Sequence, residues 1–166
     1  ETCPQSCGHW DDCYGNNMPF AHRLEHGPEL EARLVEEVRE KSFYASTKAR
    51  NILIRLHVLG DFYSVDYVQM WRKLMGLHKN LYVWGYTHHT AKEGGPIYEE
   101  LFAIRNEFRD RWFVRWSDTG MRFSANSEKL GTRGIVCPEQ EGKTAACTTC
   151  SLCWDAPDKN IIFKTH

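Results

Sequence analysis

The residues of this sequence with the strongest chemical signature are its seven cysteines, which lie only near the two ends of the chain. Thiolates are strong ligands for zinc and for iron–sulfur clusters, so we expect metal binding. A disulfide framework is the weaker explanation, because such frameworks are typical of small secreted chains with even numbers of cysteines. The seven are Cys3, Cys7, Cys13, Cys137, Cys147, Cys150 and Cys153.

The C-terminal cysteines have the spacing C-x9-C-x2-C-x2-C, and Cys137 is followed by proline. Zinc sites usually take cysteines in two separated pairs, whereas three cysteines two residues apart plus a distant fourth resemble the ligands of a ferredoxin cubane. We therefore expect Cys137, Cys147, Cys150 and Cys153 to hold a [4Fe–4S] cluster. A zinc site built from the same four thiolates is the alternative.

The N-terminal cysteines have the spacing C-x3-C-x5-C, which leaves a cubane one ligand short. An iron with an open position binds a substrate or cofactor, and S-adenosylmethionine (SAM) is the ligand in radical SAM enzymes. Their usual spacing is C-x3-C-x2-C, so this segment departs from it. The alternative is zinc held by Cys3, Cys7 and Cys13, with or without His9.

Composition limits the class of protein. A chain of 166 residues is expected to form one domain over residues 1–166, with a core that needs no disulfides. The net charge of −1 gives no basic footprint, so nucleic acid is not an expected partner. No apolar run reaches the length of a membrane span, and no leader-like start is present, so we expect a soluble, intracellular protein.

Hydrophobic periodicity predicts an α/β domain, because strands recur about every 30 residues with a helix in each gap. The architecture is expected to be an open parallel sheet or a partial β/α barrel. Helices are expected at 29–41, after Ser64 as a cap, and at 96–108, and strands at 52–60, from Leu81, from Arg111, at 134–138 and at 160–166.

In parallel sheets, catalytic and binding residues usually lie beyond the carboxyl ends of the strands, which all point to the same end of the sheet. The polar residues that follow the strands are therefore the candidate pocket. The candidate catalytic residues are Asp61, which could hold an amino or ribose hydroxyl group, and His88 and His89, which could act in proton transfer or ligation. A plain turn is the alternative for Asp61, and simple solvation is the alternative for the histidines. The expected cofactor-binding or substrate-binding residues are Gly60, Asp61, Thr87, His88, Ser117, Arg55 and Arg115.

Arg55 and Arg115 lie within segments that otherwise look buried on both faces. A buried charge must be paired or line a cavity, and a cavity with two arginines would suit an anionic ligand. An internal salt bridge is the alternative.

Taken together, the segments TCPQSCGHWDDCY, IRLHVLGDF, YTHH, CPEQEGKTAACTTCSLCW and NIIFKTH resemble a family encoded by bacteriophages and plasmids, related to the gene product 88 family. The resemblance spans nearly the whole chain. It implies an iron–sulfur or other metal protein with a radical-SAM-like partial barrel, acting in the cytoplasm of an infected bacterium. A small-molecule cofactor or substrate and an electron-donor protein are the partners that this implies. A zinc-stabilised binding module and a non-catalytic electron carrier remain the alternatives.

Overall fold

The computed structural model describes Thr2, Cys3, Cys7, Asp11, Cys13, Met18 and residues 23–156 and 158–164. His9, the fourth zinc ligand considered above, lies outside the described residues. The elements in chain order are α1 (Pro28–Ser46), β1 (Ile52–Arg55), α2 (Val65–Leu77), β2 (Leu81–Thr87), α3 (Pro96–Glu107), β3 (Trp112–Ser117), β4 (Ser124–Ser127), a 3₁₀ turn (Glu128–Leu130), β5 (Ile135–Val136), α4 (Cys147–Cys150), α5 (Leu152–Asp155) and β6 (Ile161–Phe163).

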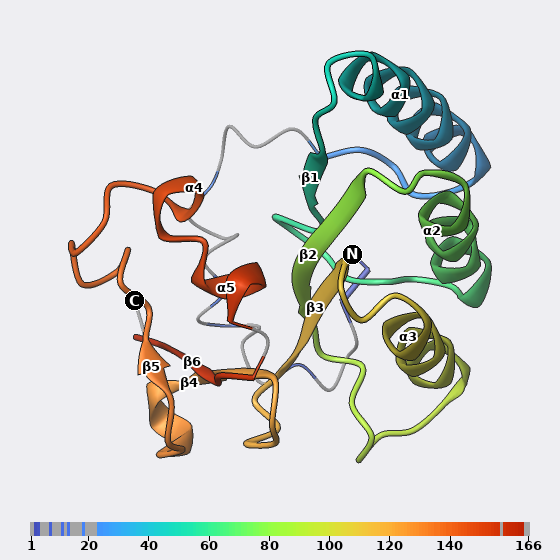
Figure 1. Cartoon of the computed structure of the whole chain (residues 1–166). Helices are drawn as coiled ribbons and strands as arrows, with labels where there is room; N and C mark the ends of the chain where they lie inside the picture. The colour runs from blue at the N-terminus through green and yellow to red at the C-terminus, as the bar shows by residue number, and fades with distance from the viewer. Residues whose placement is uncertain are drawn as a thin grey trace.

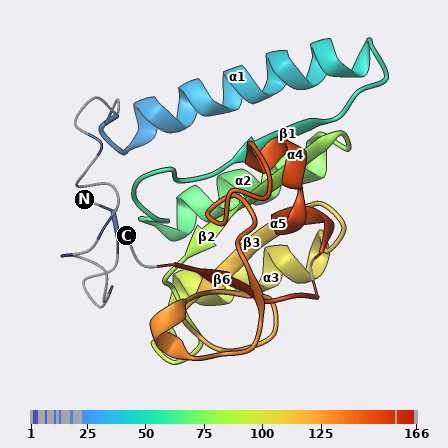
Figure 2. The ribbon, with the colours of Figure 1, turned by 90° about the vertical axis from the view of Figure 1, so that its left-hand side faces the viewer.

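All strand pairs are parallel, and the strand order across the sheet is β1-β2-β3-β4-β6-β5. The sheet is open, with β1 and β5 at its edges, which confirms the expected α/β class. Helices α1, α2 and α3 cover one face of β1–β3, and the C-terminal segment with α4 and α5 lies on the other side (Figures 1 and 2). The sheet therefore separates a helical layer from a cysteine-bearing layer.

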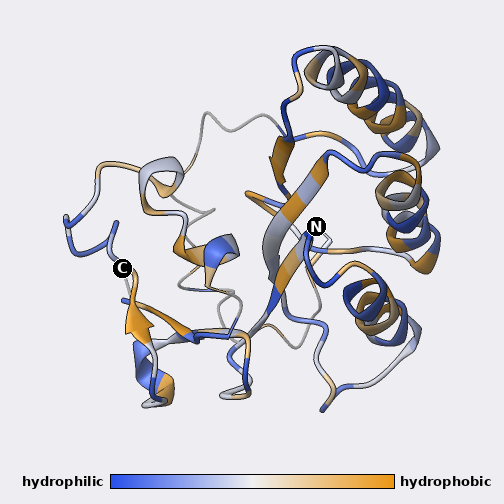
Figure 3. Cartoon of the chain, in the orientation of Figure 1, coloured by the Kyte–Doolittle hydropathy of each residue, from blue (hydrophilic) through white to orange (hydrophobic). Residues whose placement is uncertain are grey.

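Side-chain alternation along the central strands creates these two layers. In β2 and β3, Val83 and Trp112 belong to the cluster that packs under the helices, whereas Trp84 and Phe113 belong to the cluster on the cysteine side. Figure 3 shows hydrophobic residues on the strands and mixed hydropathy along the three long helices. A strand buried on both faces reads as a nearly continuous apolar run, as both of these do.

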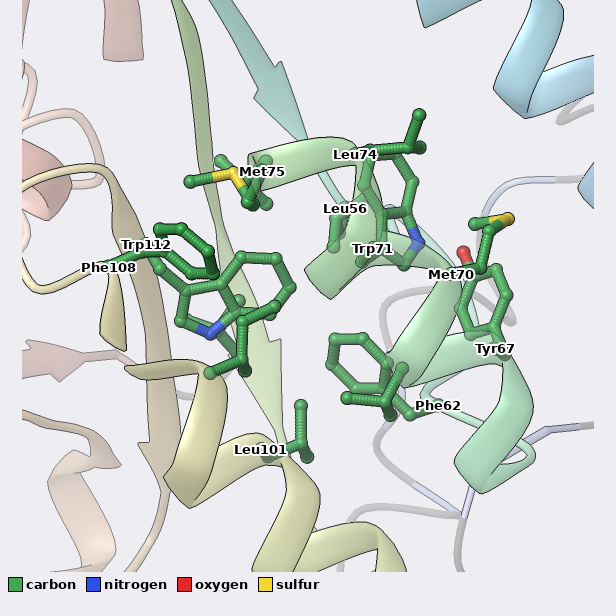
Figure 4. Close-up of a cluster of buried hydrophobic side chains, with 14 of the residues drawn as sticks. Leu56, Phe62, Tyr67, Met70, Trp71, Leu74, Met75, Leu101, Phe108 and Trp112 are labelled. Atoms are coloured by element: carbon green, nitrogen blue, oxygen red, sulfur yellow. The ribbon is translucent and has the colours of Figure 1, made fainter. Parts of the chain in front are cut away.

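The larger core lies between the helices and the sheet, where Trp71 of α2 and Trp112 of β3 are each 1 % exposed. Figure 4 shows these rings with Phe62 and Leu101 in the same cluster. Aromatic side chains of this size dominate burial in a small domain. The helices are thus held mainly by apolar packing, and among the described residues the buried cluster on this side contains no cysteine.

Helix α2 begins as the sequence predicts. Ser64 is its N-cap, and the hydroxyl oxygen accepts a hydrogen bond from the Tyr67 amide at 3.0 Å. Helix α1 extends to Ser46, beyond the expected end at residue 41. Within the described residues, no helix is long and apolar enough to cross a membrane.

Two strand predictions are wrong in detail. The first strand was expected to run to Gly60 with both faces buried, but β1 ends at Arg55, and Leu53 and Arg55 are exposed. His57 has a positive φ of 52°, which an extended strand cannot contain. β4 was not predicted, because its sequence, Ser-Ala-Asn-Ser, has no hydrophobic pattern. It is nevertheless buried between β3 and β6.

Replacing Leu101 by alanine is expected to destabilise the protein by about 3 kcal/mol, because the side chain is 0 % exposed in the helical core and its loss leaves a cavity. The matched control is Phe102→Ala on the same helix, where the side chain is 46 % exposed, with an expected cost below about 1 kcal/mol. Urea unfolding of both variants measures the difference. Equal costs would contradict this description of the core.

Candidate functional site

The four C-terminal cysteines line one pocket, although they span residues 137–153 of the chain. Leu152, Trp154 and Ile161 complete its apolar wall. Cys137 and Cys153 are buried, whereas Cys147 and Cys150 are half-buried. The four thiols, some of which are distant in the sequence, thus border the same pocket.

Local backbone geometry explains how Cys147, Cys150 and Cys153 come to line the same pocket. Cys147 and Cys150 are three residues apart on the single turn α4, and positions i and i+3 of a helix are neighbours. Ser151 then has a φ of 56°, which breaks the helix and starts the separate turn α5. That change of direction places Cys153 in the same pocket.

Cys137 reaches the pocket from a strand end. Its amide donates to the Ile162 carbonyl oxygen at 2.8 Å, which extends the pairing of β5 with β6 by one residue. The following turn is closed by the Lys143 amide, which donates to the Pro138 carbonyl oxygen at 2.8 Å. The chain then returns across the sheet, so that Cys153 reaches Tyr86 on β2, with 3.1 Å between the sulfur and the phenol oxygen.

Arg115 of β3 fixes the cysteine-bearing segment to the sheet. Its side chain is 0 % exposed, and its guanidinium donates hydrogen bonds to four carbonyl oxygens of the returning chain. The acceptors are Cys153 at 3.1 Å, Lys159 at 2.6 Å, Leu152 at 3.5 Å and Ala156 at 2.9 Å. Arg115 thus holds protein backbone where an anionic ligand was expected.

The environment of two of these thiols, Cys147 and Cys153, raises their affinity for protons. Burial is the main reason that the pKa values of Cys147 and Cys153 lie above the ordinary value, and the neighbouring cysteines add to it. Tyr86 and Arg115 act in the opposite direction on the pKa of Cys153. A bound cation or iron–sulfur cluster would relieve the repulsion among thiolates, since metal ligands bind in the deprotonated form.

The donor set fits a metal group, but the pocket is narrow. Its volume of about 10 Å³ has room for about one water molecule. Across the described residues, no three His, Cys, Asp or Glu side chains already converge on a single ion. Either zinc or a cluster would therefore require side chains to rotate. Cys147 and Cys150, half-buried on a one-turn helix, are the ones placed to do so.

The N-terminal cysteines lie at a second place, a cleft of about 1060 Å³ between α1 and β1. Cys3, Cys7 and Cys13 line it together with apolar residues of α1 such as Leu34 and Val38. Arg55, Gly60 and Asp61, three of the expected pocket residues, line the same cleft. Its volume is in the range of small-molecule sites.

The Gly60–Asp61 turn holds the N-terminal segment in place. The Asp61 amide donates to the Thr2 hydroxyl oxygen at 2.9 Å, next to Cys3 in the chain. Gly60 has a φ of 87°, and a Cβ there would collide with the Thr2 side chain. Only glycine suits both the backbone conformation and this close approach.

The Asp61 carboxylate joins two strand ends. It is buried, and it accepts hydrogen bonds from the Thr87 hydroxyl at 2.8 Å, the His88 amide at 2.7 Å and the Phe62 amide at 2.8 Å. His89 Nε2 donates to the Phe62 carbonyl oxygen at 2.7 Å. These bonds connect the loop after β1 to the end of β2, so Asp61 stabilises the relative position of these two segments.

His57 lies in the wall of the same cleft. Its Nε2 is 3.2 Å from the Tyr67 hydroxyl, and Nδ1 is buried without a hydrogen-bond partner among the described residues. Burial lowers the pKa of His57 to about 4, against the opposing charge of Asp61. The imidazole is therefore neutral near pH 7.

Only some of the expected pocket residues line the cleft of the N-terminal cysteines. Arg55, Gly60 and Asp61 line the cleft, whereas Thr87, His88, Ser117 and Arg115 are not part of its wall. Because all strands are parallel, Cys137 after β5 and Asp61 after β1 follow the same end of the sheet, but at opposite edge strands.

Sequence reasoning missed Tyr86 and Trp84, the residues of β2 that face the C-terminal cysteines. Trp84 is opposite Arg55 in the β1–β2 register, and Tyr86 is opposite Arg115 in the β2–β3 register. The period of two along β2 could have placed them on one face, but only the position of the C-terminal segment identifies that face as the cysteine side.

Comparison with known proteins gives one match. The family model described as gene product 88 matches residues 15–101, which is just over half of the 166 residues. This range begins after Cys13 and ends before Cys137, so it contains none of the seven cysteines. It covers α1, β1, α2, β2 and the start of α3. No curated protein and no solved structure matches the chain.

Arg115→Met is expected to destabilise the protein by about 3 kcal/mol, because it leaves buried carbonyl oxygens without donors. It should also increase amide exchange in residues 152–159, which the arginine anchors. Arg122→Met is the control, since that side chain is 77 % exposed and, within the described part of the chain, forms an ion pair with the exposed Asp158. Stability and exchange equal to those of the control would refute the anchoring role.

The burial of His57 predicts a pH-dependent stability. Between the ordinary pKa of 6.5 and the folded value of about 4, the unfolded chain binds more protons, so the free energy of unfolding decreases as the pH falls through this window. The total loss is about 3 kcal/mol. His57→Asn, which tolerates the positive φ, should flatten the profile measured by urea unfolding. An unchanged slope in the variant would contradict the burial effect.

Proposed function

The chain belongs to the gene product 88 family, and we propose that it is an iron–sulfur protein with a cysteine group at each end of the chain. In this proposal Cys137, Cys147, Cys150 and Cys153 hold one [4Fe–4S] cluster, and Cys3, Cys7 and Cys13 hold a second. The observation that carries the proposal is the shared pocket of the four C-terminal cysteines. Membership of a phage-related family agrees with the resemblance found in the sequence.

The surroundings of the C-terminal group support a cluster. Three of its thiols come from two consecutive helical turns separated by one left-handed residue, which suits a ligand with several metal atoms on its corners. Trp84 and Trp154 pack together with ring centroids 5.0 Å apart beside the cysteines, and such rings exclude water. A cluster bound there would supply one-electron chemistry.

Hydrogen bonds to the ligand sulfur atoms are typical of iron–sulfur sites. With Cys153 as a thiolate, the Tyr86 hydroxyl is the donor across their 3.1 Å contact. Arg115 adds positive charge on the same side, since it lowers the pKa of Cys153 against the larger effect of burial. Both features favour the thiolate form of Cys153, which any metal ligand requires.

The N-terminal group differs because it has three thiolates and an adjoining cleft. Three ligands leave one metal atom of a cubane open, and the cleft of about 1060 Å³ gives a small molecule access to it. The wall combines apolar residues with charged side chains of both signs, among them Arg55, Lys41 and Glu37, so a zwitterionic ligand with an apolar part fits its chemistry. SAM is the first ligand to test, and turnover of such a ligand would make the protein an enzyme.

The first experiment is metal and sulfide analysis of the protein purified without oxygen. We expect about eight iron atoms and eight acid-labile sulfides per chain, four for each cubane, and a visible spectrum that dithionite bleaches. SAM should perturb the EPR signal of the N-terminal group. Stoichiometric zinc without sulfide would overturn the proposal in favour of a zinc-stabilised binding module. About four irons without a response to SAM would favour a single electron-transfer cluster.

Paired variants assign the metal to each group. Cys147→Ser with Cys150→Ser should remove about half of the iron, and Cys3→Ser with Cys7→Ser should remove the other half, because serine oxygen is a poor ligand for iron–sulfur clusters. Ser46→Ala with Ser127→Ala is the control pair, distant from both groups in sequence, and should retain all of it. Iron content unaffected by either cysteine pair would refute the assignment.

A further inference from the structure

Arg55 is the last residue of β1 and faces the cysteine side of the sheet. It lines the cleft that also contains Cys3, Cys7 and Cys13. Its guanidinium carbon lies 5.0 Å from the ring centroid of Trp84, its partner in the β1–β2 register. This cation–π contact fixes the direction of a side chain that is otherwise exposed.

Trp84, which Arg55 contacts, also connects to the C-terminal cysteine group. Trp84 packs on Trp154 with ring centroids 5.0 Å apart, and Trp154 is part of the pocket wall of the C-terminal cysteines. Trp84 also belongs to the apolar cluster that contains Cys137, Cys147 and Cys153. Two aromatic rings therefore span the space between Arg55 and the C-terminal thiols.

We propose that Arg55 joins the two cysteine groups into one site, in which its guanidinium lies between them and acts on both. This inference rests on the proposed function, since it concerns the metal groups that the cysteines would hold. Two clusters bound by seven thiolates would place negative charge on both sides of this arginine. A positive charge between them stabilises the reduced, more negative form of each, and so raises both reduction potentials.

The test measures the potential of each group separately. Cys147→Ser with Cys150→Ser leaves the N-terminal group, and Cys3→Ser with Cys7→Ser leaves the C-terminal group. Arg55→Gln is then added to each background, and the potentials are determined by EPR-monitored titration at low ionic strength, where charge effects are least screened. We expect both potentials to shift to more negative values, with Arg55→Lys restoring most of each shift.

Arg39→Gln is the matched control, because it removes one positive charge from the exposed face of α1, where Arg39 pairs with Glu36. It should shift neither potential. The dithionite-reduced parent protein supplies an independent readout. Its EPR spectrum should be broadened relative to the sum of the two single-group variants, because neighbouring paramagnetic clusters interact.

The outcomes separate this inference from the proposed function. A parent protein without iron and sulfide would refute the proposed function. If the parent protein holds iron–sulfur clusters in both groups but Arg55→Gln shifts one or neither potential, the role of Arg55 is refuted and the proposed function stands. An EPR spectrum equal to the sum of the separate groups would likewise place them apart. If Arg55→Gln fails to fold, Arg55→Met, which also removes the charge, and the spectral broadening still decide.

Discussion

A guanidinium group with no exposure to water is the constraint on which the cysteine side of this protein depends. Arg115 remains charged in a buried position, and such a charge is tolerated only when its donors are satisfied. Four carbonyl oxygens of residues 152–159 satisfy them. The arginine therefore dictates the path of the returning chain, and with it the position of Cys153 and the wall formed by Trp154.

A buried carboxylate has the corresponding role at the edge of the sheet. Asp61 connects the loop after β1 with the end of β2, and the Thr2 hydroxyl accepts from its amide. The N-terminal cysteine segment is thereby attached to the turn that begins at Gly60. Two buried polar side chains, each satisfied by backbone or hydroxyl groups, thus position the two cysteine groups on one parallel sheet.

The two faces of the sheet have different tasks. The helical face is an apolar core of large aromatic and aliphatic side chains, with Trp71 and Trp112 at its centre. The opposite face carries Trp84, Tyr86 and Arg115, all directed toward the cysteine-bearing segment. The apolar packing that stabilises the fold is thus mainly on the first face, and the second face carries the polar side chains that contact the C-terminal cysteine segment. The family match covers mainly the scaffold, and the cysteine groups lie at its two ends.

The sequence by itself determined the features that depend on neighbouring residues. Apolar periodicity placed α3 and β3 within a residue of their observed starts, Ser64 identified the start of α2, and the recurrence of strands and helices gave a parallel α/β sheet. Cysteine spacing likewise predicted that the thiols at 147–153 lie together, and all three line one pocket. Each of these signals spans a few residues, over which chain geometry is nearly fixed.

Only the tertiary structure decided which distant residues meet. The sequence could not show that Arg115 would bind backbone carbonyls, that Tyr86 would contact Cys153, or that Arg55 would pack on Trp84. Nor could it reveal β4, because its four small residues are buried by neighbouring strands and have no hydrophobic pattern of their own. Contacts of this kind depend on strand order and register, which the whole chain fixes at once and which no local pattern encodes.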